Sequence, residues 1–274
     1  MNLIIYAAIV IAAAGLAVAA VLIVRRRAPE GGFFNDSDRA AGVFGVLATG
    51  FTLLLGFIVF LAFTSYDQSR VGAEREALVT AQQVETAQFL PQPTAGELTG
   101  QLVCYARSVV YVEWPLMEAG DLDAEINPWG IELFHSLQGV QPASASEEAA
   151  YGKWLDQTSD REEARTDRVH GADGIIPVPL WVAMGVIALI IFGYVLLFAD
   201  SGEPAVIQGI QVGGVVSVMV VLLLLLSFLN DPYGPDVGGL KPTAMERTLV
   251  LMDQAMQVTP AQEPIPCDEL GNKL

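Results

Sequence analysis

One face of a predicted membrane helix carries small, hydroxyl-bearing and aromatic residues at helical spacing. They recur three or four positions apart and are Gly45, Thr49, Thr52, Gly56, Phe60 and Phe63. Such spacings place residues on one side of a helix. Small and hydroxyl-bearing side chains leave room for water, and a ring of Phe60 or Phe63 from several copies would form a hydrophobic constriction that gates by dewetting. One interpretation of this stripe is therefore a pore lining.

Helix packing is the second interpretation of the same stripe. Glycine and threonine let neighbouring helices approach closely in lipid, and phenylalanine fills the space between them. Residue types alone leave both interpretations open, and packing is the commoner use of such residues. For the pair Gly209 and Gly213, which forms a GxxxG pattern in a later apolar run, we predict packing.

The two cysteines are Cys104 and Cys267. Two apolar runs separate them, so any four-span topology puts both on the same side of the membrane. If that side is oxidising, a disulfide between them is allowed. The alternative is two unpaired thiols, because spacing alone cannot show that the Cα atoms approach within about 7 Å. Both states remain open at this point.

Signs of enzymatic chemistry are weak. His135 and His170 are the only histidines, and neither has neighbouring residues at a zinc-binding spacing. The chain has no phosphate-binding Walker loop, no G-x-S-x-G and no H-E-x-x-H. We therefore predict no enzyme, no catalytic residue, no metal site and no cofactor.

Four apolar runs must position the candidate residues. They are Leu3–Val24, Ala40–Phe63, Ile176–Ala199 and Ala205–Leu229. Each has at least the roughly 20 residues that a helix needs to cross a bilayer. None contains Asp, Glu, Lys, Arg or His, which disfavours proton-relay pumps because these use ionisable groups within the membrane. The lipid bilayer is thus the first predicted partner.

These runs predict an all-α membrane protein, with four transmembrane helices in two pairs and a helical extramembrane domain inserted between the second and third spans. The expected domains are a first helix pair with a short Arg-rich loop, an acidic helical insert, a second helix pair, and a Gly/Pro-rich tail with a short helix. Their bounds are 1–65, 66–175, 176–229 and 230–274.

Basic residues set the expected orientation. Arg25, Arg26 and Arg27 follow the first run, and short loops rich in arginine stay in the cytoplasm. The N-terminus, the insert and the tail are then outside a bacterial cytoplasmic membrane. The insert holds 19 acidic and 7 basic residues, a net charge of −12, and the tail holds 7 and 3, a net charge of −4. Nucleic acid is excluded as a partner, since little here would neutralise phosphates.

Periodicity predicts helices in the insert and the tail. No proline occurs from Ala40 to Phe89, so the second span is expected to continue past the membrane as one helix. Further helices are predicted over residues 98–119, interrupted at Pro115, and over 131–137, 146–170 and 244–256. Ser144 with Glu147 forms a capping box.

Charges of both signs alternate near the end of the insert. Arg161, Arg165 and Arg168 lie among Glu162, Glu163 and Asp167. Such interleaving more often gives i,i+4 pairs on a solvated surface than a binding site. We therefore expect these arginines to be exposed.

The chain resembles the bestrophin-like family of bacterial membrane proteins. The matching stretches are Gly56–Leu78, Tyr105–Pro115, Pro177–Val182 and Leu229–Pro235. The family name implies kinship with bestrophins, which are pentameric ion channels whose second span lines the pore and carries aromatic gate residues. The equivalents here would be Phe57, Phe60 and Phe63. One difference stands out: bestrophins keep their helical domain in the cytoplasm, whereas the arginines here put it outside.

Two functions follow from these patterns. The first is a homo-oligomeric ion channel whose second span lines the pore and whose acidic insert favours cations. The second is a non-conducting structural protein that docks other membrane or envelope proteins through its outer helical domain.

Overall fold

A computed structural model describes residues 3–121, 127–172, 174–235, 237–258 and 264–274. The chain divides into two compact units. The apolar unit consists of Met1–Thr64, Gly174–Asn230 and Pro235–Gly238, and the polar unit consists of Ser65–Asp173, Asp231–Gly234 and Gly239–Leu274. All the regular elements among the described residues are helical.

The apolar unit contains four helices that are long and apolar enough to cross a membrane. They are α1 (Leu3–Arg25), the first part of α2 (Ser37–Ala87), α7 (Val178–Leu197) and α8 (Ala205–Asn230). Each corresponds to one predicted apolar run. Asp36 caps the start of α2, where its carboxylate accepts a hydrogen bond from the backbone N–H of Arg39 at 3.0 Å.

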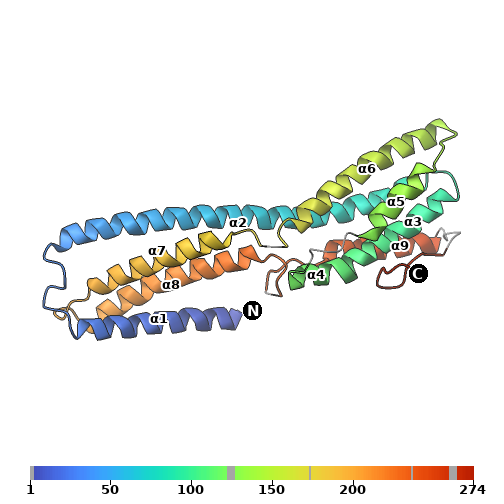
Figure 1. The fold of residues 1–274 in the computed structure, drawn as a ribbon. Helices are drawn as coiled ribbons and strands as arrows, with labels where there is room; N and C mark the ends of the chain where they lie inside the picture. Colours follow the sequence, from blue (N-terminus) through green and yellow to red (C-terminus); the bar gives the residue numbers. More distant parts are fainter. Residues whose placement is uncertain (1–2, 122–126, 173, 236, 259–263) are drawn as a thin grey trace. The chain divides into compact units, whose positions relative to one another are not determined.

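Helix α1 packs along the length of α8, and the two run side by side in Figure 1. The GxxxG pattern makes this contact. A Cβ atom on Gly213 would lie 3.2 Å from the side chain of Val18, and one on Gly209 would lie 3.4 Å from it. The prediction that these glycines serve helix packing is confirmed.

The loop after α1 meets the turn between α7 and α8. Arg25 donates hydrogen bonds to the backbone carbonyls of Ser201 and Glu203, and the carboxylate of Asp200 accepts one from the backbone N–H of Gly31. Gln208 donates to the carbonyl of Asp200 at 2.8 Å. The two short loops of the apolar unit therefore lie at the same end of the helices.

Helix α2 belongs to both units. Its 51 residues are one continuous helix, which confirms the prediction from the missing prolines. Residues up to Thr64 lie in the apolar unit, and those from Ser65 to Ala87 lie in the polar unit.

The polar unit joins the insert and the tail, which we expected as separate segments. Besides the end of α2, its helices are α3 (Thr94–Ser108), α4 (Trp114–Ala119), α5 (Pro128–Gln138), α6 (Ala145–Val169) and α9 (Thr243–Val258). One hydrophobic core draws residues from all of these helices. Helix α9 and the C-terminal residues pack into the same core as the insert because Met245, Met252 and Cys267 are buried there.

Two local features orient side chains in this unit. A π-helical turn, η1 (Val109–Glu113), joins α3 to α4 just before Pro115. Proline has no N–H to continue the hydrogen-bond ladder, so the interruption predicted at Pro115 takes the form of a wider turn. The capping box is also confirmed: the hydroxyl of Ser144 accepts a hydrogen bond from the backbone N–H of Glu147 at 3.2 Å.

Candidate functional site

Most of the stripe on α2 faces away from the rest of the apolar unit, and Thr52 lies at its edge, where it lines a cavity with residues of α7 and α8. Thr49, Thr52 and Gly56 are exposed, and Phe60 and Phe63 are 63% and 54% exposed. A Cβ atom on Gly45 or Gly56 would meet no described atom within 4 Å. Packing against helices of the same chain therefore does not explain these residues. A pore lining and a contact with a second copy both remain compatible with this geometry.

A different face of α2 packs inside the apolar unit. Its buried residues are Phe51, Leu55, Ile58 and Ala62. At 3.6 residues per turn this face is centred roughly 130° around the helix from the stripe. Phe57 is exposed but lies roughly 100° from the centre of the stripe on the same reckoning. Of the three phenylalanines that the resemblance singled out, only Phe60 and Phe63 share the face with Thr49 and Thr52.

The hydroxyl of Thr52 is turned towards the helix backbone. It donates a hydrogen bond to the carbonyl of Ala48 at 2.9 Å. Thr64 bonds the carbonyl of Phe60 in the same way, also at 2.9 Å. The donors are satisfied within α2, so what Thr52 offers to a neighbour or to water is the acceptor capacity of its oxygen.

Cys104 and Cys267 form a disulfide in the polar unit, with their Cα atoms 5.7 Å apart. Cys104 lies on α3 and is fully buried. Next to the disulfide, Arg107 donates a hydrogen bond to the carbonyl of Asp268 at 3.1 Å, and a Cβ on Gly271 would lie only 2.5 Å from the backbone nitrogen of Ser108. The end of the chain is thus held closely against α3.

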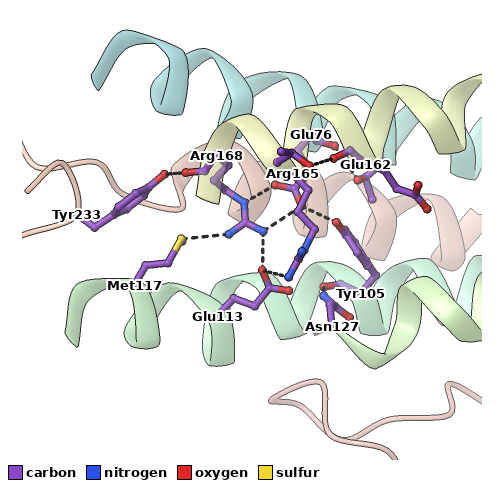
Figure 2. A network of polar contacts seen from close by, with 11 residues as sticks. Glu76, Tyr105, Glu113, Met117, Asn127, Glu162, Arg165, Arg168 and Tyr233 are labelled. Atoms are coloured by element: carbon purple, nitrogen blue, oxygen red, sulfur yellow. Dashed lines mark hydrogen bonds and ion pairs between the residues drawn. The ribbon is translucent and has the colours of Figure 1, made fainter. Parts of the chain in front are cut away.

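A buried ionic network occupies the centre of the polar unit (Figure 2). The guanidinium of Arg168, on α6, is bidentate to the carboxylate of Glu76, on α2. Its NH2 group also donates to Glu113, at the end of η1, at 2.6 Å. All three side chains are at most 1% exposed. Three elements are therefore tied together through a single arginine.

Neighbouring side chains complete the network. The hydroxyl of Tyr105 donates to Glu76 at 2.5 Å, and Arg165 lies 3.4 Å from Glu113. The hydroxyl of Tyr233 donates to the backbone carbonyl of Arg168. Both oxygens of Glu76 accept hydrogen bonds, whereas Glu113 is held through Oε2 alone and its Oε1 is buried without a partner among the described residues. The arginines thus compensate the charge of both buried carboxylates.

The network shifts the pKa values of its members. Burial by itself would raise the pKa of Glu113, but Arg168 and Arg165 outweigh it and hold that pKa below its ordinary value. Burial would lower the pKa of Arg168, yet Glu76 and Glu113 raise it well above its usual range. Burial, followed by Glu76, raises the pKa of Tyr105, and burial raises that of Tyr233 to about 12. Both tyrosines are therefore neutral at physiological pH.

The expectation that the arginines of α6 form exposed surface pairs is wrong for two of them. Arg161 and Arg168 are 1% and 0% exposed, because both belong to the helix face that packs into the core. That face also carries Ala150, Trp154, Gln157 and Ala164. The signal was present in the sequence: spacings of four and three continue the buried positions into Arg161, Arg165 and Arg168. Glu113 had a comparable signal, since it lies four residues after Val109 in an apolar stretch, whereas Glu76 stands among polar residues that do not mark it as buried.

The Bestrophin-like domain, as a sequence family, matches residues 11–236 of this chain. A search of curated proteins with this chain found no match.

Solved structures with a similar fold include a bacterial bestrophin homologue from Klebsiella pneumoniae. It superposes with a TM-score of 0.67 at 15% sequence identity, over 89% of this chain and 98% of that chain. A variant of the same homologue gives a TM-score of 0.70 at 14% identity, over 90% and 97% of the two chains. At this level of identity the likeness shows a shared fold.

Proposed function

The chain belongs to the Bestrophin-like family, whose domain spans residues 11–236, and on that premise we propose that it is a homo-oligomeric ion channel in which α2 lines the pore. Several copies would surround one axis, with Thr49, Thr52 and Gly56 facing it. Phe60 and Phe63 would form the hydrophobic constriction. The observation that carries the proposal is the exposed stripe on α2.

Exposure of the stripe supports this arrangement in two ways. Contact with lipid tails does not require small or hydroxyl-bearing residues, because lipid tails pack equally well against any aliphatic side chain. A face of such residues is well suited to water or to a second helix. In the polar unit, Val71 and Leu78 of the same helix are also exposed, at 45% and 58%. Exposed apolar residues seven positions apart on one helix favour contact between copies along α2.

Cations are the ions that we propose to pass. The insert carries a net charge of −12 and the tail one of −4. A strongly acidic surface raises the local concentration of cations and lowers that of anions. No Asp, Glu, Lys, Arg or His lies within the four apolar runs, so any selectivity would come from this surface charge and from the width of the constriction.

We further propose that the four spans are arranged as two pairs in a bacterial inner membrane, with the N-terminus, the insert and the tail outside. Arg25, Arg26 and Arg27 favour a cytoplasmic loop after α1. The disulfide between Cys104 and Cys267 supports the same orientation, since disulfides persist in oxidising compartments and are rare in the cytoplasm. Alkylation of unreduced membranes tests this: the proposal expects no free thiol, and two reactive thiols would contradict it.

Planar-bilayer recording of the purified protein tests the channel. The wild type is expected to conduct, and Phe60→Ala is expected to raise the conductance or the open fraction because it widens the apolar constriction. Leu61→Ala is the matched control, since Leu61 is 48% exposed but lies off the stripe. Silence of the wild type, or equal effects of the two substitutions, would count against the pore.

A non-conducting protein that docks membrane or envelope partners is the second candidate. Exposed aromatic side chains on the polar unit favour it, with Phe89, Tyr111 and Phe134 each at least half exposed. A stoichiometric partner that co-purifies with a silent wild-type protein would support this function in place of the channel.

A further inference from the structure

A cavity of about 320 Å³ opens beside the ionic network, wholly within the polar unit. It is lined by Tyr105, Asn127, Gly130, Ile131, Phe134, Arg161, Glu162 and Arg165. This volume lies at the lower end of the range for small-molecule sites, roughly 300–1,000 Å³. The cavity therefore has room for a molecule with a single ring or a short chain.

One wall of the cavity is cationic. Arg161 is 1% exposed. Its NH1 group donates to the neutral side chain of Gln83 at 2.8 Å, and its guanidinium lies 4.8 Å from the centre of the Tyr105 ring. Among the residues that the structure describes, no carboxylate lies within ion-pair distance of Arg161. A buried guanidinium that pairs only with neutral groups is unusual, because burial of an unpaired charge is costly.

A count of charge around the cavity gives the same result. Among the described residues, Arg161, Arg165 and Arg168 supply three positive charges from one face of α6, and Glu76 and Glu113 supply two buried carboxylates. A third carboxylate, that of Glu162, also lines the cavity but is exposed to solvent. Tyr105 stays neutral. In addition, the Nε–H of Arg165 is buried without a hydrogen-bond partner among the described residues. Within the part of the chain that the structure describes, one positive charge without a buried carboxylate partner and one unpaired donor thus lie next to an open cavity.

The opposite wall is apolar. Ile131 and Phe134, on α5, are 53% and 51% exposed and line the same space. Glu162 also lines it, but its side chain is exposed to solvent, where its charge is screened.

We propose that this cavity binds a small organic monocarboxylate, whose carboxylate pairs with Arg161 and Arg165 and whose apolar body packs against Ile131 and Phe134. Guanidinium groups bind carboxylates through paired, charge-assisted hydrogen bonds. A single negative charge balances the surplus, whereas a phosphate dianion would exceed it. Binding at this cavity does not require that the protein conducts ions, so the two proposals are tested separately.

Ligand-observed NMR on the full-length protein in a neutral detergent tests the proposal, with benzoate as the probe. Benzamide has the same shape without the charge and should bind at least tenfold more weakly, since hydrogen bonds between charged groups are worth more than neutral ones. Chloride at the same concentration should not displace benzoate. Equal binding of benzoate and benzamide, or displacement by chloride, would overturn the assignment.

Three variants locate the site. Arg161→Gln should weaken benzoate binding at least tenfold. Phe134→Ala should weaken it about threefold, and because this side chain is half exposed the substitution leaves the core intact. Arg75→Gln is the matched control, since Arg75 is a partly exposed arginine of the same unit that does not line the cavity. The affinity of this variant for benzoate should equal that of the wild type. Benzoate binding that is insensitive to Phe134→Ala and Arg161→Gln would refute the site.

Discussion

Replacement of Arg168 by methionine tests whether the ionic network holds the polar unit together. The substitution keeps an apolar stem of similar length but removes the charge between Glu76 and Glu113, which are at most 1% exposed. Two buried carboxylates would then face each other without their main partner. Loss of one member of a buried ion pair costs about 3–5 kcal/mol.

Urea unfolding of the full-length protein in detergent measures this cost. Trp114, Trp129 and Trp154 are buried in the polar unit, and the fourth tryptophan, Trp181, lies in the apolar unit. With Trp181→Phe as the background, tryptophan fluorescence reports on the polar unit. With a denaturant dependence of about 2 kcal/mol per molar urea, the midpoint should fall by about 1.5–2.5 M.

Arg75→Met is the matched control. Arg75 pairs with Asp160 at 3.0 Å and Glu163 at 3.3 Å, but these side chains are 40–64% exposed. Exposed pairs contribute about 0–1 kcal/mol, a shift of at most about 0.5 M. Adding Glu76→Gln and Glu113→Gln to Arg168→Met should recover part of the loss, because the stranded charges are then removed. Equal shifts for Arg168→Met and Arg75→Met would refute the reasoning.

Two further predictions follow from single contacts. The pKa of Glu113 is held below its ordinary value, so the ionised carboxylate stabilises the fold fully above about pH 4.3, and this stability is lost as the pH falls through the lower pKa of the folded state. Glu113→Gln should therefore lower stability at pH 7 and make the unfolding midpoint fall less steeply with acid. A fall as steep as that of the wild type would contradict this. Gly213→Leu should lower the thermal stability of the detergent-solubilised protein by about 1–3 kcal/mol, because a Cβ at this position lies 3.2 Å from the side chain of Val18. Gly214→Leu is the control and should not lower it, since a Cβ there meets nothing within 4 Å. Similar losses in both variants would argue against close packing of α1 on α8.

Much of the helical layout could be predicted because it depends on local patterns. Charge-free runs gave the four long apolar helices, the absence of proline gave the length of α2, and Pro115 gave the interruption before α4. Each of these signals acts within a few turns of one helix.

The buried network could not be predicted in the same way. Glu76 and Arg168 are 92 positions apart in the sequence, and a charged residue by itself is expected at the surface. Only the repeat of buried positions on α6 could have shown that Arg161 and Arg168 point inward. The joining of insert and tail into one unit likewise depends on contacts between distant segments, such as Trp129 with the backbone of Gly271 at 2.7 Å.

The most direct test of the pore is cysteine modification during bilayer recording. The two native cysteines are joined in a disulfide, so Thr52→Cys introduces a single free thiol on the stripe and Leu61→Cys introduces one on an exposed position away from it. A positively charged methanethiosulfonate reagent should block the current through Thr52→Cys and leave that through Leu61→Cys unchanged. Current that persists in modified Thr52→Cys channels would contradict a pore lined by α2.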